Sequence, residues 1–306
     1  MTMSVTTPRD VEITMTTDDG HTLHGTLTLP DGPGPHPAVL CLPGSGKVDR
    51  DSNAGRLRME LGVPLSHALA RQGMASLRYD RRGVGASPGD WRAAGFVDNR
   101  DDAVLALRTL RARPEVEAGK VGVLGHSEGA VHAMWLGSHE QPAAVVLLAG
   151  YARPGKEALL WQASRVGDTL PGLVRPLLPL LGKVGLKQLT ALENTSTDVA
   201  RVGGAKINAR WWREQLVHDP RADLPGITAP VLAITGDKDL QVDAADLEVV
   251  ASLVPHAETR CAPGLTHLLR VDPGAPKLTS YSRLLRRPVD AGLLTEVSSW
   301  LAQRLR

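Results

Sequence analysis

The sequence has few cysteines, almost no net charge and no long apolar run without interruption. Only 2 of its 306 residues are cysteines, too few for the disulfide framework of a small secreted domain. Cys41 and Cys261 each lie in an apolar, strand-like run, so we expect two buried thiols in a reducing compartment. Because 35 Lys and Arg residues face 33 Asp and Glu residues, charge gives no reason to expect a nucleic-acid partner.

The apolar segments are too short or too interrupted to form a secretory signal or a membrane-spanning helix. Residues 1–10 are polar and lack the apolar stretch of a secretory signal. The most apolar segment, residues 170–186, contains three prolines and two basic residues, so we expect no membrane span. These observations predict a cytoplasmic protein.

Short β-type runs alternate with helical patterns along most of the chain. Residues 11–17 and 22–29 flank an Asp-Gly step that is typical of a tight hairpin turn. Continuous apolar runs then indicate buried strands, and apolar residues at helical spacing indicate helices at 98–113 and 294–305. The predicted strands after the hairpin are 38–42, 75–79, 120–124, 143–148, 231–235 and, more weakly, 258–262. This order favours an α/β fold with a mostly parallel sheet and helices on both faces.

The alternation stops between Tyr151 and about Pro225, where we find no convincing strand. We interpret residues 151–225 as a helical cap inserted into a core formed by residues 1–150 and 226–306. The insertion has an excess of positive charge, which either attracts an anionic substrate or belongs to a solvated helical surface.

The segment from Lys120 to Ala130 contains G-H-S-E-G between a predicted strand and a helix. In this context the motif predicts a nucleophile elbow, a sharp turn that presents the hydroxyl of Ser127 at the carboxyl edge of the sheet. The backbone N–H of Glu128 then lies beside the site as a donor to an oxyanion. The alternative is an ordinary loop serine.

A second oxyanion donor is expected from the loop Leu42–Gly46, and we assign it to the backbone N–H of Ser45. The alternative is a flexible glycine-rich connector. A phosphate-binding loop is excluded, because that motif requires Gly and Ser or Thr at the positions occupied by Cys41 and Val48.

A serine nucleophile needs a histidine base and an acid that orients it. Of the ten histidines, His267 follows the last predicted strand and lies in a loop on the same edge as Ser127. Asp237 and Asp239 both follow the strand 231–235. We favour Asp239 as the acid, because it lies further into the loop, and Asp237 as a brace of the turn. The order Ser127, Asp239, His267 is that of the α/β-hydrolases.

With these residues, the chain resembles the α/β-hydrolase superfamily over residues 11–302. The segments LPGSGKVDRD, YDRRGVGAS, GHSEG and GDKDLQV look like those of bacterial serine carboxylesterases. The resemblance implies an eight-stranded core sheet, a helical cap after the sixth strand, and hydrolysis of small-molecule esters through an acyl-enzyme. It also implies that Asp239 is the acid and that no cofactor or metal takes part.

Several points stay open at the level of the sequence. The same catalytic residues serve thioester, lactone or amide cleavage and acyl transfer, and the fold also serves non-catalytic binding of a small ligand. Trp161, Trp211 and Trp212 either line a substrate pocket or pack the cap on the core. The charged residues at 49–51 and 80–82 either contact substrate or form an ion-pair brace between two loops, which we favour. The oligomeric state is not indicated.

Overall fold

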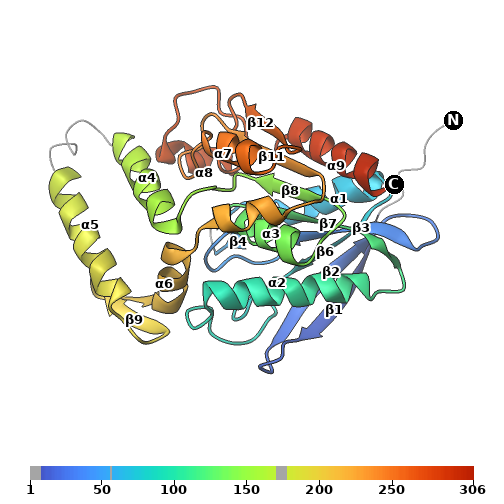
Figure 1. Ribbon diagram of the computed structural model, residues 1–306, viewed down its shortest axis with the longest axis horizontal. Helices are drawn as coiled ribbons and strands as arrows, with labels where there is room; N and C mark the ends of the chain where they lie inside the picture. The colour runs from blue at the N-terminus through green and yellow to red at the C-terminus, as the bar shows by residue number, and fades with distance from the viewer. Residues whose placement is uncertain (1–7, 56, 170–177) are drawn as a thin grey trace.

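The computed structural model describes residues 8–55, 57–169 and 178–306, and a twisted eight-stranded sheet forms its centre (Figure 1). The strand order is β1-β2-β6-β3-β7-β8-β11-β12. The pairs β1–β2 and β2–β6 are antiparallel and the remaining pairs are parallel. The strands are β1 (Arg9–Thr16), β2 (Thr22–Leu29), β3 (His36–Leu42), β6 (Ala75–Tyr79), β7 (Val116–His126), β8 (Val145–Leu148), β11 (Val231–Gly236) and β12 (Glu258–Ala262). The predicted fold class, a mostly parallel sheet of the α/β-hydrolase type, is confirmed.

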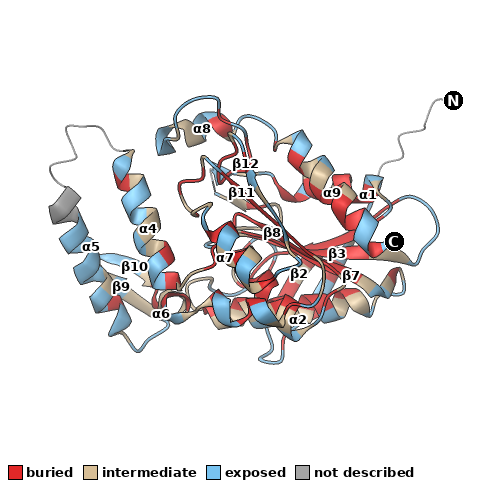
Figure 2. Ribbon diagram, turned by 45° about the horizontal axis from the view of Figure 1, so that its top comes forward, coloured by how far each residue is buried: buried red, intermediate tan, exposed pale blue. Residues whose placement is uncertain are grey.

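Helices cover both faces of the sheet because successive strand residues point to opposite sides. In β3, Leu40 and Leu42 pack into one hydrophobic cluster, with α2, α3 and α7, whereas Val39 and Cys41 pack into another, with α1 and α9. Figure 2 shows the buried strands between these helices. The helices are α1 (Gly62–Arg71), α2 (Phe96–Arg111), α3 (Glu128–His139), α7 (Asp246–Leu253), α8 (Tyr281–Leu284) and α9 (Ala291–Leu305).

The segment between β8 and β11 lies beside the core, at the carboxyl ends of the parallel strands (Figure 1). It contains the helices α4 (Gly155–Asp168), α5 (Leu178–Glu193) and α6 (Ala209–Val217). We propose that it is the cap, with the predicted limits 151–225. At its start, the guanidinium of Arg153 binds Asp243 and Asp246 of the core. At the start of α6, the side-chain amide of Asn208 donates to the carbonyls of Trp91 and Ala94.

The expectation that residues 151–225 contain no strand is wrong. Strands β9 (Val199–Val202) and β10 (Ala205–Asn208) form a small antiparallel hairpin. Its turn consists of Gly203 and Gly204, both with positive φ angles. A Gly-Gly step between two β-prone tetrapeptides is a recognised hairpin signal, and the sequence contained it. A second small sheet pairs β4 (Asn53–Ala54) with β5 (Leu57–Arg58).

The prediction of two buried thiols holds for one cysteine and fails for the other. Cys41 is buried in β3, in the middle of the sheet, whereas Cys261 is exposed. The cause is the position of β12, which is the last strand of the sheet and is partly open to solvent.

In the part of the chain that the structure describes, no helix has both the length and the apolar composition needed to cross a bilayer. Residues 170–177 of the apolar segment discussed above lie outside the described residues.

An ion-pair brace joins the loop after β3 to the loop after β6, as favoured from the sequence. The Arg50 guanidinium donates to Asp80 Oδ2 from Nε (3.1 Å) and Nη2 (2.9 Å). The backbone N–H of Arg50 donates to Oδ1 of the same carboxylate at 2.7 Å, and Ala86 N donates to Oδ2 at 2.9 Å. Asp80 is only 3% exposed, so this carboxylate satisfies donors from both loops inside the protein.

Replacing Asp80 with Asn should destabilise the fold by about 2 kcal/mol, because it removes the buried one of the two carboxylates that pair with the Arg50 guanidinium and leaves only the exposed Glu12. Urea unfolding of the two proteins measures the difference. The control is Arg108→Gln, which removes an ion pair to Glu140 on the surface and should not change the unfolding midpoint measurably. Equal stabilities of Asp80→Asn and the unmodified protein would contradict the role assigned to this brace.

Candidate active site

Ser127 lies on a strained turn between β7 and α3. Its φ of 55° and ψ of −120° are unfavourable for a residue with a side chain, at a cost of about 1–3 kcal/mol. Close packing imposes this conformation. A Cβ on Gly125 would lie 2.0 Å from the carbonyl oxygen of Gly129, and a Cβ on Gly129 would lie 2.3 Å from that of Leu42. The two glycines of the motif therefore allow the helix to start directly against the sheet.

His267 and Asp239 lie next to Ser127 in one hydrogen-bonded chain. Nε2 of His267 is 3.1 Å from Ser127 Oγ, and Nδ1 is 2.8 Å from Asp239 Oδ2. Because an ionised carboxylate only accepts hydrogen bonds, Nδ1 carries the proton and Nε2 is free to accept one from the serine hydroxyl. The structure brings together the three residues selected from the sequence.

Backbone hydrogen bonds orient the carboxylate of Asp239, and Asp237 makes a different contact. Asp239 is 4% exposed, and its Oδ1 accepts hydrogen bonds from the backbone N–H groups of Gln241 (2.7 Å) and Val242 (2.9 Å). This arrangement leaves Oδ2 for His267. Asp237 instead accepts from the N–H of Gly264 at 2.6 Å, so it joins its own loop to the loop of His267, whereas the sequence predicted a brace of its own turn.

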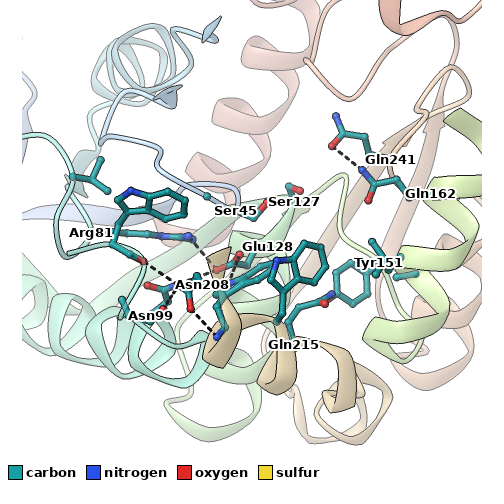
Figure 3. A pocket seen from close by; sticks show the side chains of 18 of the residues that line it. Ser45, Arg81, Asn99, Ser127, Glu128, Tyr151, Gln162, Asn208, Gln215 and Gln241 are labelled. Atoms are coloured by element: carbon teal, nitrogen blue, oxygen red, sulfur yellow. Dashed lines mark hydrogen bonds and ion pairs between the residues drawn. The ribbon is translucent and has the colours of Figure 1, made fainter. Parts of the chain in front are cut away.

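The two residues predicted to supply the oxyanion donors line one cavity together with Ser127. Glu128 begins α3, where backbone N–H groups have no acceptor within the helix. Ser45 is in the loop after β3, and both residues line the same cavity as Ser127 (Figure 3). Gly44 packs against the elbow, since a Cβ there would lie 3.4 Å from the Cβ of Ser127.

A cavity of about 390 Å³ opens above Ser127, between the core and the cap. Its aromatic lining includes Trp91, Tyr151, Trp211 and Trp212. Trp161, the third tryptophan proposed from the sequence, is not among the lining residues. Its ring instead faces the guanidinium groups of Arg153 and Arg165, whose carbons lie 5.9 and 5.8 Å from the ring centre. Within the described ranges, no cluster of His, Cys, Asp or Glu could hold a metal ion.

The side chain of Glu128 is a feature of the site that sequence reasoning missed. Sequence analysis selected only its backbone N–H, but its carboxylate is 3% exposed and forms an ion pair with Arg81. The remaining partners come from α2, α3 and α6. The sequence did contain a signal for this ion pair. Glu128 is a charged residue directly after Ser127, at a position that the turn buries, and buried charged residues are usually paired.

His126, the residue before Ser127, is hydrogen-bonded to the backbone of His267. It is 3% exposed, and its Nε2–H donates to the backbone carbonyl of His267 at 3.0 Å. Burial, reinforced by the nearby His267, lowers the pKa of His126 to about 3. His126 therefore stays neutral and holds the histidine loop without adding charge.

This pKa predicts a contribution of His126 to the pH dependence of stability. Between about pH 6.5, its ordinary pKa, and pH 3, the unfolded chain binds a proton that the folded chain does not. Stability is therefore lost as the pH falls through this range and is unaffected above it. In His126→Gln, the slope of unfolding free energy against pH, measured by urea unfolding near pH 5, should decrease by about 1.4 kcal/mol per pH unit. An unchanged slope would show that His126 is charged in the folded protein.

Comparison with known proteins agrees with this architecture. The model of the family described as serine aminopeptidase, S33, matches residues 62–274. Esterase EstD of Thermotoga maritima is 27% identical over 285 residues, which cover 92% of this chain and 66% of EstD. The chain thus spans slightly less than two thirds of that relative's length.

Solved structures share the fold at lower sequence identity. The esterase Pf2001 of Pyrococcus furiosus has a TM-score of 0.64 and 15% identity, and the match covers 98% of this chain and 92% of that one. The α/β-hydrolase GrgF from Penicillium sp. sh18 has a TM-score of 0.63 and 18% identity, with coverage of 98% and 99%. Because the family model matches more than half of the chain, including Ser127, Asp239 and His267, this protein belongs to the serine aminopeptidase S33 family of α/β-hydrolases.

Proposed function

We propose that this protein is a serine hydrolase that cleaves carboxylic esters of small molecules through an acyl-enzyme intermediate. The observation that carries the proposal is the hydrogen-bonded chain from Asp239 through His267 to Ser127 at the base of the cavity. The similarity to EstD, an esterase, supports the same conclusion.

In the first half of the reaction, Ser127 Oγ attacks the carbonyl carbon of the ester while His267 Nε2 takes the hydroxyl proton. Asp239 keeps the imidazole in the required tautomer and stabilises its charged form. The negative charge that develops on the carbonyl oxygen is stabilised by the N–H groups of Ser45 and Glu128. His267 then transfers its proton to the leaving alcohol oxygen, and the C–O bond breaks.

In the second half, water replaces the alcohol. His267 takes a proton from the water as its oxygen attacks the acyl carbon, and then returns a proton to Ser127 Oγ as the acid leaves. The same oxyanion donors act in both halves. The residues of the site supply every proton transfer, so the mechanism requires no cofactor.

The charge balance of the cavity favours uncharged substrates. Among its described lining residues, Arg81 is paired with Glu128, and Arg82 with Asp19 and Asp102. The aromatic side chains and the amides of Gln162 and Gln241 complete a neutral wall. An ionised ester would have to leave water without a free counter-charge, which is unfavourable.

The proposal is tested by the protein's reaction with an organophosphonate and with p-nitrophenyl butyrate. We expect turnover of the ester, and a phosphonate adduct that peptide mass mapping locates on Ser127. Ser127→Ala should abolish both reactions while keeping the unfolding midpoint. Undiminished ester turnover by Ser127→Ala, or an adduct on another residue, would refute the assigned nucleophile.

Two neighbouring aspartates give a matched test of the acid. Asp239→Asn removes the acceptor that fixes the tautomer of His267, so kcat for p-nitrophenyl butyrate should fall about 10⁴-fold. Asp237 lies two residues away and accepts a hydrogen bond from the N–H of Gly264. The kcat of the Asp237→Asn variant should therefore change far less. Similar losses in the two variants would contradict the assignment of Asp239.

A further inference from the structure

The carboxylate of Glu128 collects hydrogen-bond donors from four separate parts of the chain. Its Oε1 is 3.1 Å from Arg81 Nη1, 3.2 Å from Asn99 Nδ2 and 3.1 Å from His132 Nε2. Its Oε2 accepts from the indole Nε1–H of Trp211 at 3.0 Å. Both oxygens of the residue that follows Ser127 are thus engaged.

These donors keep the carboxylate ionised although it is buried. Burial by itself favours the neutral acid, but the Arg81 charge and the hydrogen bonds from His132 and Asn99 outweigh it, so the pKa of Glu128 lies below its ordinary value. An ionised carboxylate has acceptor capacity for all four donors. A neutral amide has one acceptor oxygen and presents donors of its own, so it does not satisfy the same set.

Arg81 extends this cluster to the oxyanion loop. Its Nη2 donates to the carbonyl oxygen of Pro43 at 3.0 Å, immediately before Gly44 and the proposed donor Ser45. The Arg81 side chain is 5% exposed, so it is held between two buried partners. The Glu128 carboxylate therefore connects, through one guanidinium, the two backbone segments that carry the oxyanion donors (Figure 3).

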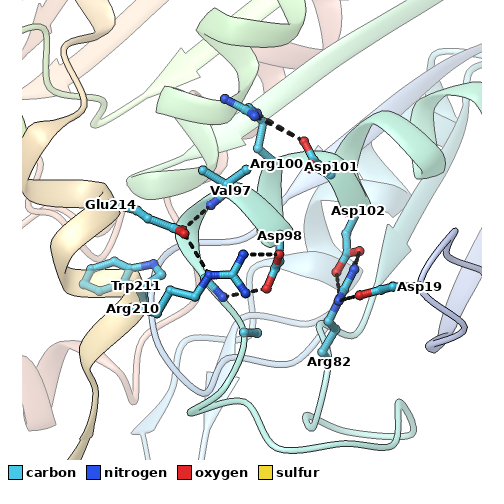
Figure 4. A network of polar contacts seen from close by, with 12 residues as sticks. Asp19, Arg82, Val97, Asp98, Arg100, Asp101, Asp102, Arg210, Trp211 and Glu214 are labelled. Carbon is cyan, nitrogen blue, oxygen red and sulfur yellow. Dashed lines mark hydrogen bonds and ion pairs between the residues drawn. The ribbon is translucent and has the colours of Figure 1, made fainter. Parts of the chain in front are cut away.

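Trp211 extends the cluster to the cap. It lies in α6, lines the cavity, and donates to Glu128 from its indole N–H. A separate attachment of α6 lies nearby, where Arg210 Nη2 binds Asp98 Oδ1 of α2 at 2.9 Å and Nε binds Glu214 (Figure 4). Arg210 and Trp211 thus each connect α6 to the core, but of these two only Trp211 contacts Glu128, the residue after Ser127.

We propose that the carboxylate of Glu128 is a positioning residue for the oxyanion hole, and that Trp211 holds this carboxylate in place from the cap. The inference rests on the proposed ester hydrolysis and adds a role for the cap in the chemical step as well as in enclosing the substrate. Small displacements of catalytic groups have large effects on rate, up to about 100-fold for 1 Å. The cluster therefore acts on kcat, because the oxyanion forms only after the substrate has bound.

The test compares Glu128→Gln and Trp211→Phe with the unmodified protein in steady-state hydrolysis of p-nitrophenyl butyrate. Glu128→Gln should lower kcat about 100-fold. Trp211→Phe removes the indole N–H but keeps an aromatic ring, and should lower kcat about 10-fold, since it affects one of four contacts. In both variants KM should change less than about 3-fold, because an interaction made in the transition state is lost.

Arg210→Gln is the matched control. It breaks the neighbouring cap-to-core ion pair, leaves Glu128 untouched, and should keep kcat within about 2-fold of the unmodified protein, because the oxyanion segments are undisturbed. The double variant Glu128→Gln/Trp211→Phe should be no slower than Glu128→Gln alone, because both changes act through the same contact. Unfolding midpoints are measured for every variant. If Glu128→Gln does not fold, the comparison of Trp211→Phe with Arg210→Gln decides.

The inference is overturned if Trp211→Phe keeps full kcat, if Arg210→Gln loses as much kcat as Trp211→Phe, or if the losses fall on KM. Additive losses in the double variant would likewise refute a shared contact. Phosphonate labelling of Ser127 in the unmodified protein separates these results from a failure of the proposed function. A protein that is labelled and turns over ester, with Glu128→Gln retaining full kcat, disproves only the inference.

Discussion

The contact between the end of β3 and the start of α3 is the constraint on which the site depends. It exists because Gly129 lacks a side chain, since a Cβ there would overlap the backbone of Leu42 and Pro43. Gly125 likewise allows the end of β7 to lie against the start of α3. This contact forces Ser127 into its strained conformation and directs its hydroxyl out of the sheet. The same packing brings the loop after β3 beside the turn of Ser127, so the close approach of the backbone places Ser127, Glu128 and the loop of Ser45 around one cavity.

Much of the fold and the three central side chains could be predicted because their signals are local. Ser127 follows a buried strand in the motif G-H-S-E-G, and Asp239 and His267 each lie in a polar loop that follows a later strand. These positions indicate that the three residues share one edge of the sheet. The choice of Asp239 over Asp237 likewise rested on how far each residue lies beyond the end of the preceding strand. Residues that follow parallel strands lie at the same edge of the sheet, so their proximity can be predicted without knowing how the side chains pack.

The features that escaped prediction depend on contacts between distant segments or on position within the sheet. The partners of Glu128 come from residues 81, 99, 132 and 211, and no local pattern indicates that they meet. Cys261 has a strand-like sequence, but its exposure depends on β12 being an outer strand. Trp161 illustrates the same limit, because a helical cap offers several tryptophans and only the docking of α4 and α6 decides which reach the cavity.

The inserted segment is attached to the core at its beginning and again at the start of α6. Arg153 secures its beginning through Asp243 and Asp246, and Asn208 secures the return to α6. Between these points, much of α5 faces solvent (Figure 2). The chain between Arg153 and Asn208 can therefore change in length while these two attachments to the core stay in place. Among the described residues, α4 and α6 contribute side chains to the lining of the cavity and α5 contributes none, so a change in the length of α5 would leave that lining as it is.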